Sequence, residues 1–526
     1  MKRLFSLLLA LLLCVTAFSF AQAEEPTPLT VAVIRRSTDT TESYSEKYFV
    51  KDSEAACNVK LTWIELPQDQ AAEPLAALLA GNLPDIFMVA DAMSDTIVLQ
   101  NSKLWQPITV DELKQYCPNL YNEYETYVDG WQAYLTYPDG NIYGLMGDFL
   151  TSNPHTIPQT QYINVQWLEN LGLEMPKTLD ELHSVLVAFK EQDANGNGDP
   201  NDEIPMTFCD NFKKGKITNY ASMWGLAIDS FTSTWYNIEN NEVVPAVNTP
   251  AFRAFLEYFN MLGQEGLLNL EGFSQTQDQF TADLDAMKVG VFWGWAPYNY
   301  ISDLDNRAQY KALVPTPADG YSALVYSSNP IRAKRNSFLI TTACKNKQAA
   351  LAWWDYISEP IHAIEAYYGE KDVWWELVDD NYNWHPITLS DEELTAKGYG
   401  AYVGKSISGA NTLGQVNGQP LMLNTEYVDL EANPKGNTES RTIAVNTYKA
   451  AGVIAPYMSN AIIPSEAQEE FDFMTEGLDN LINSFISSSI LNGVTDASWN
   501  EFVEKLEQYN YSYYLDFYSR YLHNEL

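Results

Sequence analysis

A short acidic stretch of the chain could bind a metal ion. Residues 193–205 read Asp-Ala-Asn-Gly-Asn-Gly-Asp-Pro-Asn-Asp-Glu-Ile-Pro. If Asp193 is position 1 of a loop, side-chain oxygens recur at positions 3 and 5, and Gly198 stands at position 6. That spacing is the first half of an EF-hand calcium loop. Hard oxygen ligands without a nearby His or Cys favour Ca²⁺ over transition metals.

The second half of this loop departs from the pattern. Position 12 normally supplies a bidentate Glu, but Ile204 stands there. The two acidic residues before it can close the site if the loop ends one or two residues early. An alternative is a turn that follows a helix, since Asn and Gly are common in turns. We predict a structural Ca²⁺ site with the ligands Asp193, Asn195, Asn197, Asp199 through its backbone carbonyl, Asp202 and Glu203.

Aromatic residues supply a second kind of chemistry. Residues 291–298 read Val-Phe-Trp-Gly-Trp-Ala-Pro-Tyr, and the chain holds 14 Trp. Flat rings cover the apolar face of a sugar while polar side chains bind its hydroxyls, because unpaired buried polar groups are costly. Trp293 and Trp295 would face the same side of a strand unless the run bends at Gly294. Both a cleft position and a core position are compatible with the sequence at Trp295.

Motifs of common enzyme classes are missing. The sequence contains no G-x-S-x-G, H-E-x-x-H or G-x-G-x-x-G, and its five His show no metal-binding spacing. Residues 404–406 (Gly-Lys-Ser) lack the earlier glycine of a phosphate-binding loop. We therefore predict that the protein is not an enzyme. A secreted glycoside hydrolase stays as an alternative, because it needs only two carboxylates across a cleft and the chain has 69 acidic residues.

The net charge narrows the choice of partners. Asp and Glu outnumber Lys and Arg by 69 to 31, which gives a formal net charge of −38. Such a surface repels phosphate backbones and anionic lipids, so we predict that the protein does not bind nucleic acid. The length of 526 residues and the 46% hydrophobic content are sufficient for more than one packed domain.

The first residues have the pattern of a secretory signal peptide. Lys2 and Arg3 precede the apolar run 4–20, which leads into Ala-Gln-Ala at 21–23. The run is short for a retained membrane anchor. We predict cleavage after Ala23 and export of the mature chain, whose net charge would be −40 because two basic residues leave with the peptide.

The cysteines indicate neither a lipid anchor nor a disulfide framework. Cys14 follows Leu13, where a lipidated Cys is expected to follow a small residue. A chain of this length does not need disulfides to hold its fold. Four cysteines would remain after cleavage, with no C-x-x-C pair, and we predict that they are mostly buried: Cys57, Cys117, Cys209 and Cys344.

The elements that would position these residues begin with alternating strand and helix patterns. Three short apolar or β-branched runs are typical of strands: 29–34, 59–66 and 84–90. The Ala/Leu-rich stretch 70–80 is long enough for a crossover helix. This order predicts a parallel α/β sheet, in which ligands bind outside the carboxyl ends of the strands. We therefore expect Arg35 and Asp91 to face a ligand cleft.

Two helix starts carry a capping box. Residues 109–112 (Thr-Val-Asp-Glu) and 178–181 (Thr-Leu-Asp-Glu) place a hydroxyl and a carboxylate where they can satisfy the first free backbone N–H groups. Behind the second box, apolar residues recur at helical spacing and predict one buried helix face.

The region of the acidic loop also resembles a known family. Residues 167–182 (Trp-Leu-Glu-Asn-Leu-Gly-Leu-Glu-Met-Pro-Lys-Thr-Leu-Asp-Glu-Leu) and the loop are similar to extracellular solute-binding proteins (family 1) of sugar-importing ABC transporters. They resemble in particular the subgroup with a calcium loop that includes alginate-oligosaccharide binders. Further blocks in the same order extend the similarity over nearly the whole mature chain: 81–87, 314–320, 346–357 and 498–506.

The resemblance implies a fold and a function. It implies an α/β architecture of two lobes, each a central sheet flanked by helices, with a ligand cleft between them that closes by hinge motion. It implies that a monomeric, exported protein captures an oligosaccharide or sugar-like ligand and delivers it to an ABC transporter permease. A peptide-binding transporter component is the alternative within this class. The expected division is a signal peptide (1–23), a first lobe (24–147 and 336–390) and a second lobe (148–335, with the calcium loop 193–203, and 391–526).

The resemblance also implies ligand-binding residues. Segment 291–298 matches the place of a stacking Trp in the family, so we expect Trp293, Trp295 and Tyr298 to contact the ligand. Asp148 follows the segment where the chain first crosses between lobes, and is a further hydrogen-bonding candidate. Members often carry Arg-x-Asp-Trp where this chain has Asn-Val-Gln-Trp at 164–167. The absence of that Arg from an acidic chain favours a neutral sugar over a uronate.

Overall fold

A computed structural model gives the arrangement of most of the chain. It describes residues 25–35, 43–89, 92–128, 130–150, 157–212, 214–230, 232–327, 333–378, 383–387, 391–396, 420–423, 437–457, 465–523 and 525. The predicted signal peptide and the predicted cleft residue Asp91 lie outside the described residues. Within the described part, no helix is both long and apolar enough to cross a membrane.

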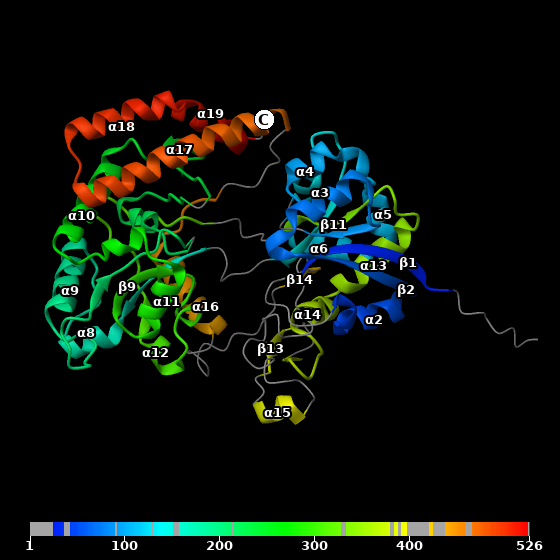
Figure 1. Cartoon of the computed structure of the whole chain (residues 1–526), viewed down its shortest axis with the longest axis horizontal. Helices are drawn as coiled ribbons and strands as arrows, with labels where there is room; N and C mark the ends of the chain where they lie inside the picture. Colours follow the sequence, from blue (N-terminus) through cyan, green and yellow to red (C-terminus); the bar gives the residue numbers. More distant parts are fainter. Residues whose placement is uncertain are drawn as a thin grey trace, which may run out of the picture.

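Two lobes, each built on its own sheet, make up the molecule (Figure 1). The first lobe has a six-stranded sheet in the order β14-β4-β11-β3-β1-β2. The second lobe has a four-stranded sheet in the order β10-β5-β9-β6. The predicted two-lobe α/β fold is therefore confirmed.

The strands and helices of the first lobe come from separate parts of the sequence. Its main strands are β1 (Thr27–Arg35), β2 (Val59–Pro67), β3 (Ile86–Met88), β4 (Gly144–Leu150), β11 (Lys334–Ile340) and β14 (Leu421–Leu423). A small sheet pairs β12 (Trp375–Leu377) with β13 (Trp384–Pro386). Its helices are α2 (Tyr48–Cys57), α3 (Ala72–Gly81), α4 (Asp95–Gln100), α5 (Val110–Tyr116), α6 (Pro118–Tyr127), α7 (Trp131–Leu135), α13 (Lys347–Ser358), α14 (Pro360–Tyr368) and α15 (Asp391–Ala396).

Strands β1, β2 and β3 pair in parallel, as the three apolar runs predict. Successive residues of β1 point into two different cores. Leu29, Val31 and Val33 belong to one apolar cluster, and Ala32 and Ile34 belong to another on the opposite face. Because both faces of the strand are buried, its sequence is an almost continuous apolar run.

The second lobe follows β4 in the chain. Its strands are β5 (Thr160–Asn164), β6 (Ile204–Met206), β9 (Val289–Gly294) and β10 (Tyr310–Ala312), with a hairpin of β7 (Tyr236–Glu239) and β8 (Glu242–Pro245). Its helices are α8 (Val165–Leu171), α9 (Leu179–Glu191), α10 (Pro250–Gln264), α11 (Gln277–Asp285), α12 (Leu304–Ala308), α16 (Asn437–Ala451), α17 (Ser465–Asn492), α18 (Asp496–Gln508) and α19 (Tyr511–Leu522). The long helix α17 packs on α10 and also contacts α4 of the first lobe.

The chain passes between the lobes after β4, before β11 and after β14. Strand β14 pairs with β4 of the first sheet although it lies beyond residue 390. We therefore propose that the second part of the first lobe extends to residue 423. A strand of three residues is too short to show a periodicity, which is why the sequence did not reveal it.

The two predicted capping boxes differ in the structure. At α5, the Thr109 hydroxyl accepts from the Glu112 N–H, and the Glu112 carboxylate accepts from the Thr109 N–H. At α9, the Thr178 hydroxyl accepts from the Glu181 N–H, but the Glu181 carboxylate accepts from the N–H of Lys177 at 2.7 Å. The first box is confirmed, and the second is a hydroxyl cap with its carboxylate turned to the preceding residue.

The four cysteines that follow the predicted signal peptide have free thiols. Three of them, Cys117, Cys209 and Cys344, are buried, and Cys57 is half-buried. The buried cysteines thus pack in the lobes as small apolar residues.

Candidate functional site

The acidic loop connects α9 to β6 in the second lobe. Its side chains fold the backbone through a series of short-range hydrogen bonds. Asn195 Oδ1 accepts from the N–H of Asn197 at 2.9 Å, and Asn197 Oδ1 accepts from the N–H of Asp199 at 2.7 Å. Asp193 Oδ2 accepts from the N–H of Gly198 at 3.0 Å. Gly198 has a φ of +93°, which a residue with a side chain rarely adopts.

Two carboxylate oxygens of this loop have no hydrogen-bond partner. They are Oδ1 of Asp193 and Oε2 of Glu203, and both atoms are buried. Burial raises the pKa of the Glu203 carboxyl. Buried polar atoms are normally satisfied, so two unpartnered oxygens in one loop fit a cation ligand set.

The remaining predicted ligands gather around Asp202. Its carboxylate accepts from the side-chain amides of Asn195 at 3.0 Å and Asn197 at 3.1 Å. Lys288 Nζ lies 3.7 Å from the same carboxylate. Ile204, at position 12, belongs to β6 and pairs with Val289 of β9. The acidic end of the loop therefore stops one residue before the position at which an EF-hand loop places its Glu.

Trp295 lies immediately after the end of β9. The ring is half-buried, and Arg441 places its guanidinium carbon 4.2 Å from the ring centroid. Lys214 Nζ lies 4.4 Å from the same centroid. The indole N–H donates to the hydroxyl of Tyr298 at 2.8 Å. Two cations and one tyrosine thus hold this ring at the carboxyl end of a strand, where open sheets bind ligands.

Arg441 of α16 connects three segments around Trp295. It is 1% exposed. Its guanidinium donates to the backbone oxygen of Trp295 at 2.9 Å, to the hydroxyl of Thr160 at 2.8 Å and to the backbone oxygen of Ile157. Ile157 and Thr160 are near the start of the described part of the second lobe, so Arg441 joins Trp295 to that start. Sequence reasoning missed Arg441, because a single Arg in a helix gives no signal of what it contacts.

Trp293 has a different environment from Trp295. It is 1% exposed and packs in the core of the second lobe, with its ring 6.0 Å from that of Tyr220. Strand β9 ends at Gly294 and the chain bends at Trp295, so the two tryptophans do not share one face of the strand. The Trp293 ring is buried in the core, so a ligand cannot stack on it in this structure. The expectation that Trp293 contacts the ligand is therefore not met.

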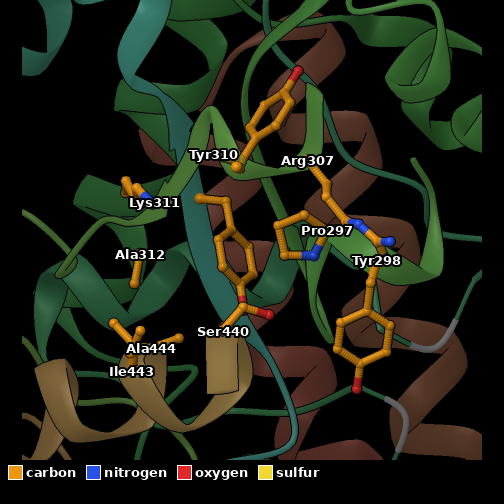
Figure 2. A pocket seen from close by; sticks show the side chains of 11 residues that line it. Pro297, Tyr298, Arg307, Tyr310, Lys311, Ala312, Ser440, Ile443 and Ala444 are labelled. Carbon is orange, nitrogen blue, oxygen red and sulfur yellow. The ribbon is translucent and has the colours of Figure 1, made fainter. Parts of the chain in front are cut away.

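Tyr298 borders a small cavity of the second lobe (Figure 2). The volume is about 40 Å³, which is enough for a water molecule but not for a sugar. Figure 2 shows Tyr298 and Arg307 on one side and Ser440, Ile443 and Ala444 of α16 on the other. This cavity is too small to be the main binding site.

A larger cavity of about 520 Å³ lies in the first lobe, at the carboxyl ends of β1 and β2. Aliphatic side chains form most of its wall, and two carboxamides provide the polar atoms. The lining residues are Ile34, Gln68, Ala71, Ala72, Leu75, Ala76, Leu79, Ala92, Ile97 and Asn101. Helix α4, which forms part of this wall, is also the helix that contacts α17 of the second lobe. The cavity therefore lies near the junction of the lobes.

The remaining predicted ligand-binding residues are only partly described. Arg35 ends β1, and its guanidinium pairs with the Glu65 carboxylate at 2.9 Å. Asp148 lies in β4, and its backbone pairs with Leu421, but its side chain is not among those described. Asp91 lies outside the described residues. The structure does not bring Arg35, Asp148 and Trp295 together in any described contact.

The chain is similar to a known protein family and to proteins of known function. The profile of the bacterial extracellular solute-binding proteins matches residues 37–362. A fructooligosaccharide ABC transporter substrate-binding protein, FusA of Streptococcus pneumoniae, is 25% identical over 483 residues, which cover 90% of this chain and 86% of FusA.

Solved structures show the same fold. An HMO-binding solute-binding protein associated with an ABC transporter, from Bifidobacterium longum infantis, superimposes with a TM-score of 0.79 at 20% identity, covering 95% of this chain and 99% of that one. A FusA EF-hand mutant in complex with fructo-nystose superimposes with a TM-score of 0.72 at 22% identity, covering 95% and 99%.

Proposed function

This chain belongs to the bacterial extracellular solute-binding protein family, and on that premise we propose that it captures an oligosaccharide or sugar-like ligand between its lobes for delivery to an ABC importer. The observation that carries the proposal is Trp295, a half-buried ring held just after a strand end and beside the first described residues of the second lobe. The similarity to FusA over most of both chains supports a glycan rather than a peptide as the ligand. The enzyme and peptide alternatives have no comparable support.

The residues around Trp295 suit stacking against a sugar. Arg441 and the Tyr298 hydroxyl fix the orientation of the ring before the ligand arrives, so little ordering is required on binding. A hinge motion that closes the lobes would cover the ligand with the first lobe. Because the ligand would contact both lobes only in the closed state, its binding would favour that state. As a family member the protein is exported, and we propose that it acts as a monomer.

Glycan binding by the mature protein tests this proposal. Calorimetry with a panel of neutral and acidic oligosaccharides should find at least one that binds saturably and is recovered uncleaved. Trp295→Ala should weaken that affinity at least 10-fold, about 1.4 kcal/mol. Trp499→Ala is the matched control, because Trp499 also lies near an arginine, Arg253, but on helix α18. Release of product, or equal affinity in both variants, would overturn the proposal.

We also propose that residues 193–203 bind a structural Ca²⁺ ion. The ligands would be Asp193, Asn195, Asn197, the Asp199 carbonyl, Asp202 and Glu203. The unpartnered oxygens of Asp193 and Glu203 fit this role, because a cation would satisfy both. The ion would fix the end of α9 against the start of β6 and is not required for chemistry.

Chelation and calcium titration test this second proposal. Removal of Ca²⁺ from the purified protein should lower the melting temperature by several degrees, and added Ca²⁺ should restore it. In Asp193→Asn, the melting temperature should no longer respond to chelation. If wild type and variant respond equally, the loop does not bind the ion.

A further inference from the structure

A second group of metal-ligating side chains lies in the first lobe, where α2, α13 and α14 meet. Asp52 of α2 and His362 and Glu365 of α14 each place one ligand atom within 4.8 Å of the others. His362 Nδ1 lies 3.2 Å from Glu365 Oε2 and 4.0 Å from Asp52 Oδ2. One ring nitrogen therefore faces two carboxylates that come from different helices.

Neighbouring groups hold these side chains in place. The Tyr356 hydroxyl donates to Asp52 Oδ2 at 2.7 Å. The Tyr356 ring stacks on the His362 ring, with centroids 4.1 Å apart and an angle of 22° between planes. On the other side of the imidazole, Nε2 lies 3.8 Å from Glu359 Oε2. Metal-binding histidines characteristically direct their second ring nitrogen toward such a carboxylate.

The charges around His362 also favour a cation. Three carboxylates, those of Asp52, Glu359 and Glu365, surround one imidazole that carries at most a single positive charge. The Glu365 side chain is only 10% exposed, so water screens its charge poorly. The Asp52 side chain is 42% exposed, which leaves a path for an ion from solvent.

We propose that Asp52, His362 and Glu365 form a binding site for a divalent transition-metal ion, with Zn²⁺ as the ion that best suits the ligands. Bonds of about 2.0–2.2 Å place two ligands of a tetrahedral ion about 3.4 Å apart. The separations of 3.2 and 4.0 Å lie on either side of that value. An imidazole ligand selects against Ca²⁺, so this site differs in specificity from the acidic loop.

Metal binding at this site would join two helices that are distant in the sequence. Asp52 lies on α2, the helix between β1 and β2, whereas His362 and Glu365 lie on the segment that returns from the second lobe. The ion would therefore stabilise the docking of the returning segment on the first part of this lobe. Its fourth ligand would be a water molecule, since the site offers three protein atoms.

Zinc titration of the mature protein tests the proposal. Calorimetry is done with ZnCl₂ on chelator-treated protein that is first saturated with Ca²⁺, so that the acidic loop is occupied. We expect one Zn²⁺ to bind per chain and to raise the melting temperature. His362→Gln and Glu365→Gln should each weaken Zn²⁺ affinity at least 10-fold, and Glu359→Gln should weaken it less.

His183→Gln is the matched control. His183 also contacts one carboxylate, that of Glu265, but no second one in any described contact. The zinc affinity of the His183→Gln variant should equal that of the wild-type protein. A rise in melting temperature on addition of Ca²⁺ shows that a variant is folded. If His362→Gln does not fold, Glu365→Gln alone tests the site. Absence of Zn²⁺ binding to wild type, or equal affinity in wild type and both site variants, would overturn the proposal while leaving glycan binding unaffected.

Discussion

The acidic loop of the second lobe (193–203) and an acidic cluster of the first lobe bring their carboxylates together in different ways. The cluster consists of Asp52, Glu123, Asp355 and Glu365. Residues 193–203 are contiguous, and most of their hydrogen bonds run to backbone or side chains within the loop. The carboxylates of the cluster come from α2, α6, α13 and α14 and meet only because these helices pack. The loop is a local structure, and the cluster is a product of tertiary folding.

Burial raises the pKa of Glu203 in the loop, and it has a larger effect on the acids of the cluster. In the cluster, burial and the nearby Glu359 raise the pKa of Asp355 to about 6, although Leu120 N–H and Asn119 donate to it. Glu123 of α6 is 7% exposed, and neither of its oxygens has a hydrogen-bond partner. Burial first, and then the charges of Asp355 and Glu359, raise its pKa to about 9. Burial in the packed lobe thus favours the neutral form of Glu123 and, less strongly, that of Asp355.

The largest effect that tests this comparison is expected at Glu123. Its folded pKa is far above the unfolded value, so the folded state retains a proton that the unfolded state releases, and stability falls as pH rises from about 4.5 to about 9. Glu123→Gln removes this loss and should stabilise the protein at pH 7 by on the order of 3 kcal/mol. Urea unfolding across this pH range measures the effect.

The difference in stability between Glu123→Gln and wild type should disappear about one pH unit below 4.5, change most steeply between about pH 5.5 and 8, and level off above about pH 9. Asp355 is present in both proteins, so its own titration largely cancels in the difference. Parallel stability curves for the two proteins would show that Glu123 is ionised in the fold, and that the two acidic regions do not differ in this respect.

An intermediate effect is expected within the acidic loop. Glu203→Gln removes a buried, unpartnered carboxylate oxygen and should weaken Ca²⁺ affinity at least 10-fold, about 1.4 kcal/mol. Asp199→Ala should change it less than threefold, because position 7 coordinates through its backbone carbonyl. Calcium calorimetry compares the two. A larger loss in Asp199→Ala would mean that the loop does not follow the EF-hand order.

The smallest effect is expected at Glu112, an acid held by local contacts. Burial opposes its ionisation, but the ammonium of Lys347 and the N–H of Thr109 lower the pKa below its usual value. Glu112 therefore contributes stability above the unfolded pKa, and this is lost as pH falls through the folded pKa. Glu112→Gln should lower the free energy of unfolding by about 1 kcal/mol at pH 7.

Chemical unfolding of Glu112→Gln at pH 7 and at pH 3 checks this value. The sign of its pH dependence is opposite to that of Glu123→Gln, although both residues lie on neighbouring helices of one lobe. The same sign in both variants would remove the distinction between acids placed by local contacts and acids buried by packing.

Much of the fold could be predicted from the sequence because its signals are local. The run at 29–34 is strand β1, whose burial on both faces requires nearly continuous apolar residues, and the run at 59–66 is its parallel neighbour β2 at the edge of the sheet. The Thr109 cap depends on residues three positions apart. Strand β14 could not be predicted, because its three residues pair with a strand from a distant part of the chain.

The site near Trp295 was predicted only in part. The segment 291–298 contains the end of strand β9. The alternation of side chains along a strand does not show at which residue the strand ends. Strand β9 ends at Gly294 and the chain bends at the next residue, so Trp293 lies in the core and Trp295 is only half-buried. Arg441, which holds Trp295, comes from a helix far along the chain.

The sequence by itself determined the acidic loop, the parallel strands and the family, because each depends on residue types at short, fixed spacings. Only the tertiary structure placed His362 beside Asp52, buried Glu123 and set Arg441 against Trp295. Those arrangements depend on which helices pack together, and side chains far apart in the chain carry no local pattern that records their contact.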